Sequence, residues 1–510
     1  MSLKGKAGAR AAVLAAVLGL IVFCSNCGDE YRPVANPVLL PGGDPQLTAH
    51  ALVVSTNGSN QGAAVVIDVS GDTAVASFTV GRNPVNATFI SGTDYVVNQA
   101  DHNVNALILA AAGSQQDLPN STITLPGPTP LTPNVPSASP VFAAPAGGKV
   151  FVTEPGSVAP TCAGSGNCVA DISVASVPPG VSHIPVGNNP VALVATPDGT
   201  QLYCLNMADG TVTVIFPATD QVVATLPVGA SPVWGAVSSD GTSVFIVNQG
   251  SSSVSVIDTN TDTVIHTLPV GTGPNYITYQ ASLNRAYVTS PAGNSLSIID
   301  NNKGTVQTIP MAGPPCNGQH PISVTALADG TRVYVADDVT SSVCVLNTVN
   351  NAFVKSIQVD ATPVGPAGIA SNSDSTRVYT ANQGTAVFSI ASISRVNDPA
   401  TGAAAVTVTT SNSNPFAVGQ LITIAGVADS TYDGQFGVIA VNSPTQFVYS
   451  QTCAVQAQCP NSSSSGGTAT ILPDVSIIET SDDTTVKSSD GVAPLTIPAG
   501  GTPTFITMTP

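Results

Sequence analysis

The chain repeats one pattern at a fixed interval. Three copies begin with VGNNP at Val186, VGASP at Val228 and VGTGP at Val270, so that successive copies lie 42 residues apart. Each copy contains short runs of Val, Ile, Leu and Tyr, with a turn such as PDGT between the first two runs and a polar turn such as TNTD between the last two. Asp-Gly pairs suit tight hairpins, and short apolar runs bounded by Gly, Asn and Asp are typical of strands. Each copy therefore predicts four short antiparallel strands.

Less regular copies extend the repeat in both directions. The second run of each copy has an apolar or aromatic anchor, and the anchors are Val53, Tyr95, Phe151, Tyr203, Phe245, Tyr287, Tyr334 and Tyr379. A period in the forties with four strands per period is the signature of a β-propeller, in which one repeat makes one blade. We therefore expect an all-β propeller of four-stranded blades, with eight blades and seven as the alternative count.

The two ends of the repeat region complement each other. HALVVSTNG begins at a second strand without a first, whereas GTPTFITMTP at the other end resembles a first strand with nothing after it. We expect Thr504–Met508 to complete the blade started by Leu52–Thr56, which would close the ring and remove free sheet edges. A composition with only 8% charged residues, 46 Gly and 41 Pro agrees with a turn-rich all-β chain.

The repeats also resemble a known family. PDGTQLYCLN, DGTSVFIVN and LNRAYVTS, each followed by strands of the SVSVID type, resemble the YVTN-type bacterial surface propellers, which are related in fold to the lactonase-like propellers. The resemblance covers roughly residues 50–390 and the last forty. It implies an exported surface protein; many members have seven blades, and most have no assigned activity.

The N-terminus has the features of an export signal. Three basic residues precede the uncharged run AAVLAAVLGLIVF, which has the length of a signal peptide and is too short for a spanning helix. The cysteines that follow resemble a lipobox, with Cys27 as the expected lipidation site and Cys24 as the second choice. Residues 1–27 are thus predicted to be a lipoprotein-type signal and residues 28–47 a Pro-rich tether. The predicted location is the cell envelope, membrane-anchored through lipid, with plain secretion as the alternative.

A non-repetitive segment interrupts the last blade. The repeat stops after TAVFSI, residues 385–390, and resumes near Asp474. In between, four β runs separated by turns resemble small β modules of phage structural proteins and other surface proteins. We predict propeller blades over 48–391, an inserted small β domain over 392–471, and the remainder of the last blade with the closing strand over 472–510. An ornamental insertion is favoured over a dedicated binding domain.

The cysteines after the signal region predict disulfides. Two pairs, Cys162 with Cys168 and Cys453 with Cys459, lie six residues apart, close enough for local bridges. Cys316 and Cys344 are candidates for a third bridge, which would leave Cys204 alone within a strand, although spacing does not fix the connectivity.

Motifs for catalysis or cofactors are not found. None of the five histidines forms an HExxH or HxH pair, and the chain has no G-x-S-x-G elbow, P-loop or GxGxxG. No cofactor is predicted; a divalent cation held by ligands from separate blades has no motif to support it. With 13 basic and 30 acidic residues and a net charge of −17, nucleic acid is not an expected partner.

Polar residues recur where second strands are expected to end, on one face of the ring. These positions and the loops beside them form a candidate ligand face: Asn98, Asp101, His102, Glu154, Asn206, Asp209, Asn248, Gln249, His320, Asp337, Asp338, Asn382 and Gln383. Asn and Asp also stabilise turns through their own backbone, and this structural role is favoured over a ligand site.

Three functions follow from these features. The first is a non-enzymatic binding or scaffold protein of the cell envelope, whose partner is a protein, a glycan or a small ligand. The second is a lactonase-like hydrolase that uses the polar mouth, and the third is a structural or adhesion component of the surface. Whether the chain is an enzyme is open, with the negative answer favoured.

Overall fold

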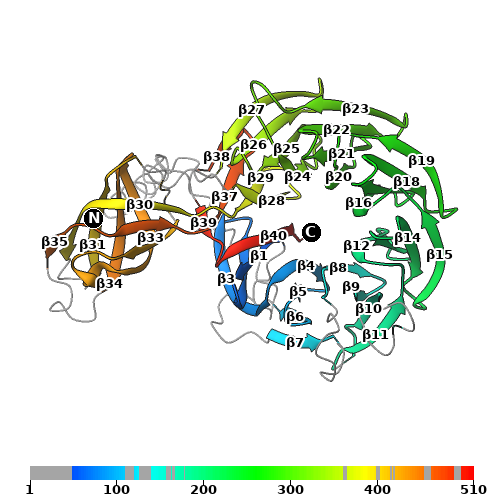
Figure 1. Cartoon of the computed structure of the whole chain (residues 1–510), viewed down its shortest axis with the longest axis horizontal. Helices are drawn as coiled ribbons and strands as arrows, with labels where there is room; N and C mark the ends of the chain where they lie inside the picture. Colours follow the sequence, from blue (N-terminus) through cyan, green and yellow to red (C-terminus); the bar gives the residue numbers. More distant parts are fainter. Residues whose placement is uncertain are drawn as a thin grey trace, which may run out of the picture.

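Eight β-sheets stand around a central opening, and a further sheet lies beside the ring (Figure 1). The computed structural model describes residues 49–108, 120–125, 139–156, 162, 167–176, 178–359, 365–397, 403–413, 416, 418, 420–452, 461–486 and 496–509. Each of the eight sheets is one antiparallel blade. No helix in these ranges has the length and apolar character needed to cross a membrane.

The blades follow the order of the chain, with the exception of the innermost strand of blade 1. The strands of the first four blades, from the innermost outward, are as follows: blade 1, β40 (Thr502–Met508), β1 (His50–Asn57), β2 (Asn60–Asp68) and β3 (Thr73–Arg82); blade 2, β4 (Pro84–Ile90), β5 (Thr93–Asn98), β6 (Asn103–Ile108) and β7 (Asn120–Thr124); blade 3, β8 (Phe142–Ala146), β9 (Lys149–Glu154), β10 (Cys168–Ser173) and β11 (Gly180–Pro185); blade 4, β12 (Pro190–Ala195), β13 (Leu202–Asn206), β14 (Thr211–Phe216) and β15 (Gln221–Pro227).

The other four blades have the same order. Their strands are: blade 5, β16 (Pro232–Val237), β17 (Ser243–Asn248), β18 (Ser253–Asp258) and β19 (Thr263–Pro269); blade 6, β20 (Tyr276–Gln280), β21 (Arg285–Ser290), β22 (Ser295–Asp300) and β23 (Thr305–Pro310); blade 7, β24 (Pro321–Ala326), β25 (Arg332–Asp337), β26 (Ser342–Asn347) and β27 (Ala352–Gln358); blade 8, β28 (Pro366–Ser371), β29 (Arg377–Asn382), β37 (Asp474–Glu479) and β38 (Thr484–Thr485), with the short β39 (Thr496–Pro498) paired to β37.

The second strands are buried on both sides, which explains why they read as continuous apolar runs. In β1, Leu52 and Val54 pack in the core between blades 1 and 2, whereas Val53 packs in the core between blades 8 and 1. Alternate side chains of a strand point to opposite faces, so one strand contributes to two inter-blade cores. The eight predicted anchors all lie on second strands and are buried.

The ring closes as predicted. β40 pairs antiparallel with β1, with Val53 opposite Ile506 and Leu52 opposite Thr507. The first and last segments therefore share blade 1, and the blades number eight rather than seven.

In three blades, an aspartate in the turn between the third and fourth strands connects the blade to the one before it. Asp262 accepts a hydrogen bond from the Tyr203 hydroxyl at 3.0 Å, Asp483 from Tyr334 at 2.5 Å, and Asp72 from Tyr379 at 2.7 Å. All three aspartates have a φ near +50°, a left-handed conformation that Asp tolerates in tight turns. This contact ties blade 5 to blade 4, blade 8 to blade 7 and blade 1 to blade 8 on the side of these turns.

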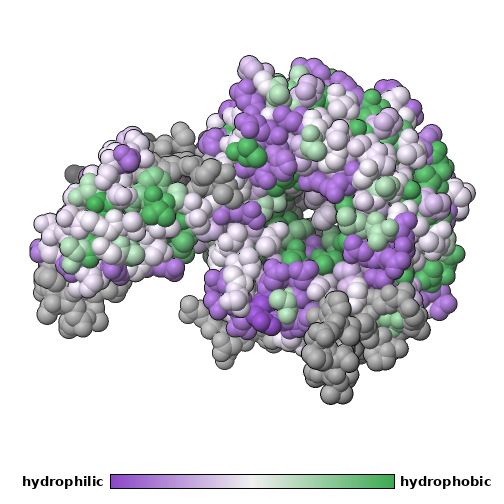
Figure 2. Space-filling model, viewed as in Figure 1, coloured by the Kyte–Doolittle hydropathy of each residue, from purple (hydrophilic) through white to green (hydrophobic). Residues whose placement is uncertain are grey.

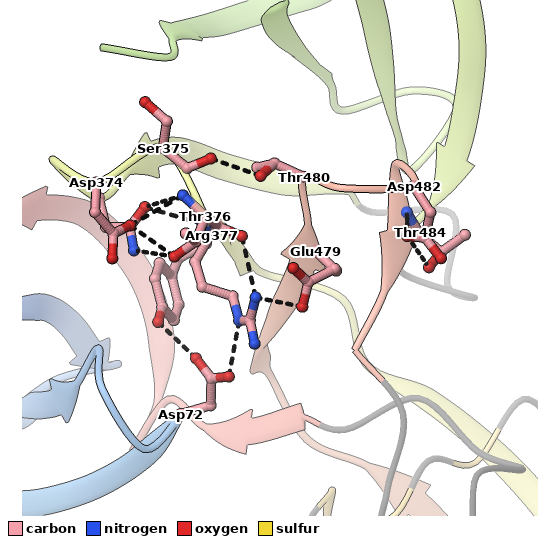
Figure 3. A network of polar contacts seen from close by, with 11 residues as sticks. Asp72, Asp374, Ser375, Thr376, Arg377, Glu479, Thr480, Asp482 and Thr484 are labelled. Atoms are coloured by element: carbon pink, nitrogen blue, oxygen red, sulfur yellow. Dashed lines mark hydrogen bonds and ion pairs between the residues drawn. The ribbon is translucent and has the colours of Figure 1, made fainter. Parts of the chain in front are cut away.

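The contact that joins blade 8 to blade 1 is extended by an arginine (Figure 3). Arg377 Nε lies 2.9 Å from Asp72 Oδ2, and its guanidinium also pairs with Glu479. The side chains of Arg377 and Asp72 are only 7% and 13% exposed. Burial, together with the charge of Asp72, raises the pKa of the Tyr379 hydroxyl, so this group acts as a donor.

The inserted sheet closes on itself. Its strands are β30 (Ala386–Asn397), β31 (Ala403–Thr410), β32 (Leu421–Ala425), β33 (Gly434–Ser443), β34 (Gln446–Thr452), β35 (Ser462–Ser464) and β36 (Thr468–Ile471), with a 3₁₀ turn, η1 (Ser430–Tyr432). Because β30 pairs with both β31 and β36, six of these strands form a closed cycle around a core of their own.

This sheet begins earlier than the boundary at residue 392 that the sequence suggested. Residues 386–390, which the sequence analysis assigned to the last blade, belong to β30 of the inserted sheet and not to blade 8. The third strand of blade 8 is β37, whose Val475, Ile477 and Ile478 are fully buried and fill both faces of the blade.

The two faces of the ring differ in what they carry. Second strands end on the same face on which innermost strands begin, as the pairings of Pro190 with Asn206 and of Pro232 with Asn248 show. We call this face the mouth face. β29 ends and β37 begins on this face, so the inserted sheet leaves the ring there. β1 begins at His50, on the opposite face, where it is hydrogen-bonded to Thr509.

Candidate functional site

Four aromatic side chains occupy the same position of the repeat in different blades. Phe142, Trp234, Tyr276 and Phe505 each lie two residues after a proline near the start of an innermost strand, on blades 3, 5, 6 and 1. All four are half-buried, and Phe142, Trp234 and Tyr276 also contact one another. Trp234 is the single tryptophan of the chain.

The three rings form one continuous cluster. The Phe142 and Trp234 ring centroids are 5.1 Å apart in an edge-to-face arrangement, and those of Trp234 and Tyr276 are 4.7 Å apart. Blade 4 stands between blades 3 and 5 and has the small Ala192 at the same repeat position. The contact between Phe142 and Trp234 therefore passes the inner edge of blade 4, which places these rings at the wall of the channel.

The hydroxyl of Tyr276 is held in its protonated form. Burial raises the pKa of Tyr276 to about 12, and a hydrogen bond with Ser323 on blade 7 acts in the opposite direction. At neutral pH this hydroxyl is therefore available as a hydrogen-bond donor, and the cluster has no charge of its own.

The ring is open at its centre. Figure 2 shows the central hollow with hydrophobic residues at part of its rim and hydrophilic residues spread over the surrounding face. A concave site lined by aromatic rings with a few polar groups has the character of a small-molecule binding site. We call Phe142, Trp234 and Tyr276, together with the inner edges of their blades, the channel site.

Six residues of the predicted ligand face are buried parts of the blades. Each ends a second strand, and they are Asn98, Glu154, Asn206, Asn248, Asp337 and Asn382. Asn206 Nδ2 donates to Thr211 and Thr213 at 3.0 and 2.9 Å, and Asn248 Nδ2 donates to Ser255 at 3.0 Å. For these asparagines the structural role weighed from the sequence fits their geometry, since their side chains bind the neighbouring third strand.

The two buried carboxylates of this set are also engaged. Asp337 accepts hydrogen bonds from the backbone of Gln319, His320 and Thr340 and from the Thr340 hydroxyl, at 2.7 to 2.9 Å. Glu154 Oε2 lies 3.0 Å from His183 Nε2, and both side chains are at most 2% exposed. Such carboxylates are poorly suited to act as bases toward a ligand in the channel.

The remaining predicted residues lie nearer the surface. Asp101 binds Arg82, Asp209 binds Asn188, and His320 Nδ1 lies 2.8 Å from Asp338 Oδ1. Gln383 donates to the carbonyl oxygen of Pro503, Gln249 is exposed, and His102 lies in a left-handed turn.

Of these residues, the structure brings only His320 and Asp338 into contact with each other. The aromatic cluster was not among the predicted residues.

Two of the three predicted disulfides are present. Cys162 bonds to Cys168 and Cys316 to Cys344, and Cys204 is a buried free thiol. Cys453 and Cys459, like Cys24 and Cys27, lie outside the described residues. Among the described residues, no group of three or more His, Cys, Asp or Glu side chains could hold a metal ion.

A second hollow lies on the face opposite the mouth, between blades 4 and 5. It has a volume of about 270 Å³ and includes Asp198 and Asp240 in its lining. Hydrogen bonds from Thr196 and from Ser238, respectively, lower the pKa values of these carboxyls. Both carboxylates thus stabilise their own hairpin turns.

Comparison with known proteins supports the fold. Sqt1 of Chaetomium thermophilum, solved with the N-terminus of ribosomal protein L10, aligns over 66% of this chain and 92% of its own, with 12% identity and a TM-score of 0.51. The likeness is one of fold. At this identity it carries no information about partners.

Two further structures align more loosely. Hydrazine synthase of Kuenenia stuttgartiensis covers 59% of this chain and 92% of its own, with 17% identity and a TM-score of 0.45. Virginiamycin B lyase of Staphylococcus aureus covers 59% and 91%, with 15% identity and a TM-score of 0.43. No protein-family model and no curated protein matches the sequence. The specific YVTN family therefore remains a prediction.

Proposed function

We propose that this chain is an exported, non-enzymatic binding protein whose ligand enters the channel from the mouth face. The observation that carries the proposal is the cluster of Phe142, Trp234 and Tyr276, because three half-buried rings from separate blades meet at the channel wall. Large aromatic side chains dominate the energetics of recognition sites. Glu154, His183, His320, Asp337 and Asp338 at the mouth are held by hydrogen bonds or ion pairs within the protein. They are therefore poorly placed to act on a substrate, which favours binding over hydrolysis.

The single tryptophan makes this proposal directly testable. Binding at the channel site is expected to shift the emission of Trp234 saturably, because the ligand replaces water at its ring. The purified protein is titrated with neutral oligosaccharides, acidic oligosaccharides and short peptides. We expect at least one class to give a saturable shift, and isothermal calorimetry to show at least tenfold weaker binding for Trp234→Leu.

A matched control comes from the rim of blade 4, where Phe216 is 38% exposed on β14. Phe216→Leu removes an exposed aromatic ring outside the channel and is expected to leave affinity unchanged. If no class shifts the emission, or if Trp234→Leu binds as the parent does, the proposed function is wrong.

We also propose that the protein is held at the cell envelope through a lipid on Cys27. The two disulfides support an oxidising compartment. β1 begins on the face opposite the mouth, so an anchor that precedes it would leave the channel site directed away from the membrane.

Metabolic labelling with a fatty acid tests the anchor. We expect the label to be lost in Cys27→Ala and kept in Cys24→Ala. Label that persists in both single variants and in the double variant would contradict a lipid at either cysteine.

A further inference from the structure

The channel site combines three properties that together select a class of ligand. The first is an apolar surface made of rings. Trp234 and Tyr276 lie with an angle of 32° between their planes, and Phe142 meets Trp234 edge-on at 83°. Trp234 and Tyr276 therefore lie largely against each other, and the parts of the three rings that stay exposed form an apolar surface against which the C–H groups of a ligand can pack.

The second property is a supply of unpaired backbone groups. Each innermost strand is the end member of its sheet, so in the described structure β8, β16 and β20 pair on one side only. On β8, the N–H of Ala143 is already bound by the Asn86 side chain of blade 2. The other N–H and C=O groups on these edges point toward the channel and can bind hydroxyl groups. The Tyr276 hydroxyl is buried against blade 7, where it is hydrogen-bonded to Ser323.

The third property is the excess of carboxylates around the mouth. Asp101 is paired with Arg82, whereas, among the described residues, Asp209 is bound only by Asn188 and Asp337 only by backbone N–H groups and a hydroxyl. An anionic ligand would have to approach these carboxylates without a cationic partner, which is costly. A ligand at this site is therefore expected not to be acidic.

From these three properties we infer that the ligand of the channel site is an uncharged saccharide, one ring of which packs against the exposed part of the aromatic cluster while its hydroxyl groups bind the inner strand edges. The inference rests on the proposed function and narrows it to one chemical class. A peptide would use the strand edges in β-augmentation and would not require the rings.

The test uses calorimetry and Trp234 emission on the purified protein. Probes are maltohexaose, cellohexaose and chitohexaose as neutral oligomers, with oligogalacturonate as an acidic counterpart of similar length. We expect one or more neutral oligomers to bind at least tenfold more tightly than the acidic one. Added salt should change the affinity for the neutral oligomer by less than twofold, because no ion pair forms.

Two variants separate the roles of the groups. Trp234→Phe keeps a ring and is expected to weaken the neutral oligomer less than Trp234→Leu does, and Phe216→Leu again serves as the control outside the channel. Circular dichroism and thermal melting confirm that each variant is folded.

The outcomes are distinguishable. If a peptide or the acidic oligomer shifts Trp234 emission and the neutral oligomers do not, the channel binds a ligand but the saccharide inference is wrong. If nothing shifts the emission, both this inference and the proposed function fail.

Discussion

A chain that ends at Gly501 is expected to lose the closed ring and to unfold at a much lower urea concentration. The deletion removes β40, and with it the pairing to β1, the buried Ile506 and the contact of Phe505 with the core between blades 1 and 2. It also removes the hydrogen bond from the Thr504 hydroxyl to the carbonyl oxygen of Pro84 on blade 2. Losing two large core side chains together with a whole strand should cost on the order of 5 kcal/mol or more.

Equilibrium unfolding in urea, followed by circular dichroism, measures this loss. Ile506→Ala should account for about 2–5 kcal/mol of it. The exposed Thr502, replaced by alanine, should change stability by less than about 0.5 kcal/mol. A synthetic peptide of residues 502–510 should restore part of the stability in trans, because it can add to the free edge of β1. An unchanged urea midpoint for the truncated chain would show that β40 does not hold the ring.

Replacing Asp72 by alanine is expected to destabilise the protein by about 2–3 kcal/mol, in the range of hydrogen bonds to charged groups. Arg377 would keep Glu479 and the carbonyl oxygen of Thr376, but the Tyr379 hydroxyl would lose the acceptor that lies 2.7 Å away. Both effects act at the junction between blades 8 and 1. By comparison, Lys303 pairs with Asp300 but is 71% exposed, and Lys303→Ala should cost less than about 1 kcal/mol.

A double-mutant cycle isolates the contact. When Arg377→Met is combined with Asp72→Ala, only the more exposed Glu479 is left without its partner, so the double variant should be more stable than the sum of the two single losses implies. Urea unfolding of the four proteins gives the coupling energy. Losses that simply add would mean that Asp72 and Arg377 do not act together.

The fold could be predicted because the strands and turns recur at a fixed spacing in the sequence. Anchors such as Tyr203 and Phe245 lie at one position of a period near 42, and each is buried in an inter-blade core. The count of eight depended on joining Leu52–Thr56 to Thr504–Met508, and β40 pairs with β1 in that manner. The partners of the tyrosine hydroxyls were not predicted, because Asp262, Asp483 and Asp72 each come from the next blade around the ring.

The candidate site could be predicted only in part. Polar residues at the ends of second strands recur in the sequence, but a recurring Asn such as Asn206 or Asn248 serves the repeat itself through bonds to the third strand. The channel site is marked by residues that depart from the repeat. Phe142, Trp234 and Tyr276 have large aromatic side chains where other copies have Ala192 and Gly368, and this difference was visible in the sequence. That the three aromatic side chains contact one another could be seen only in the closed propeller.

The pairing of β40 with β1 in blade 1 also determines when the ring can close during synthesis of the chain. β40 reaches its partner β1 across more than 440 residues, so this pairing forms only after every other blade and the inserted sheet have been synthesised. Until then blade 1 has an unpaired inner edge, which is a site for mispairing with other chains. Blades 2 to 7 are contiguous in sequence and can form by local contacts, whereas completion of the ring has the slow kinetics of a long-range contact. Completion of the ring therefore waits for the last strand to be synthesised.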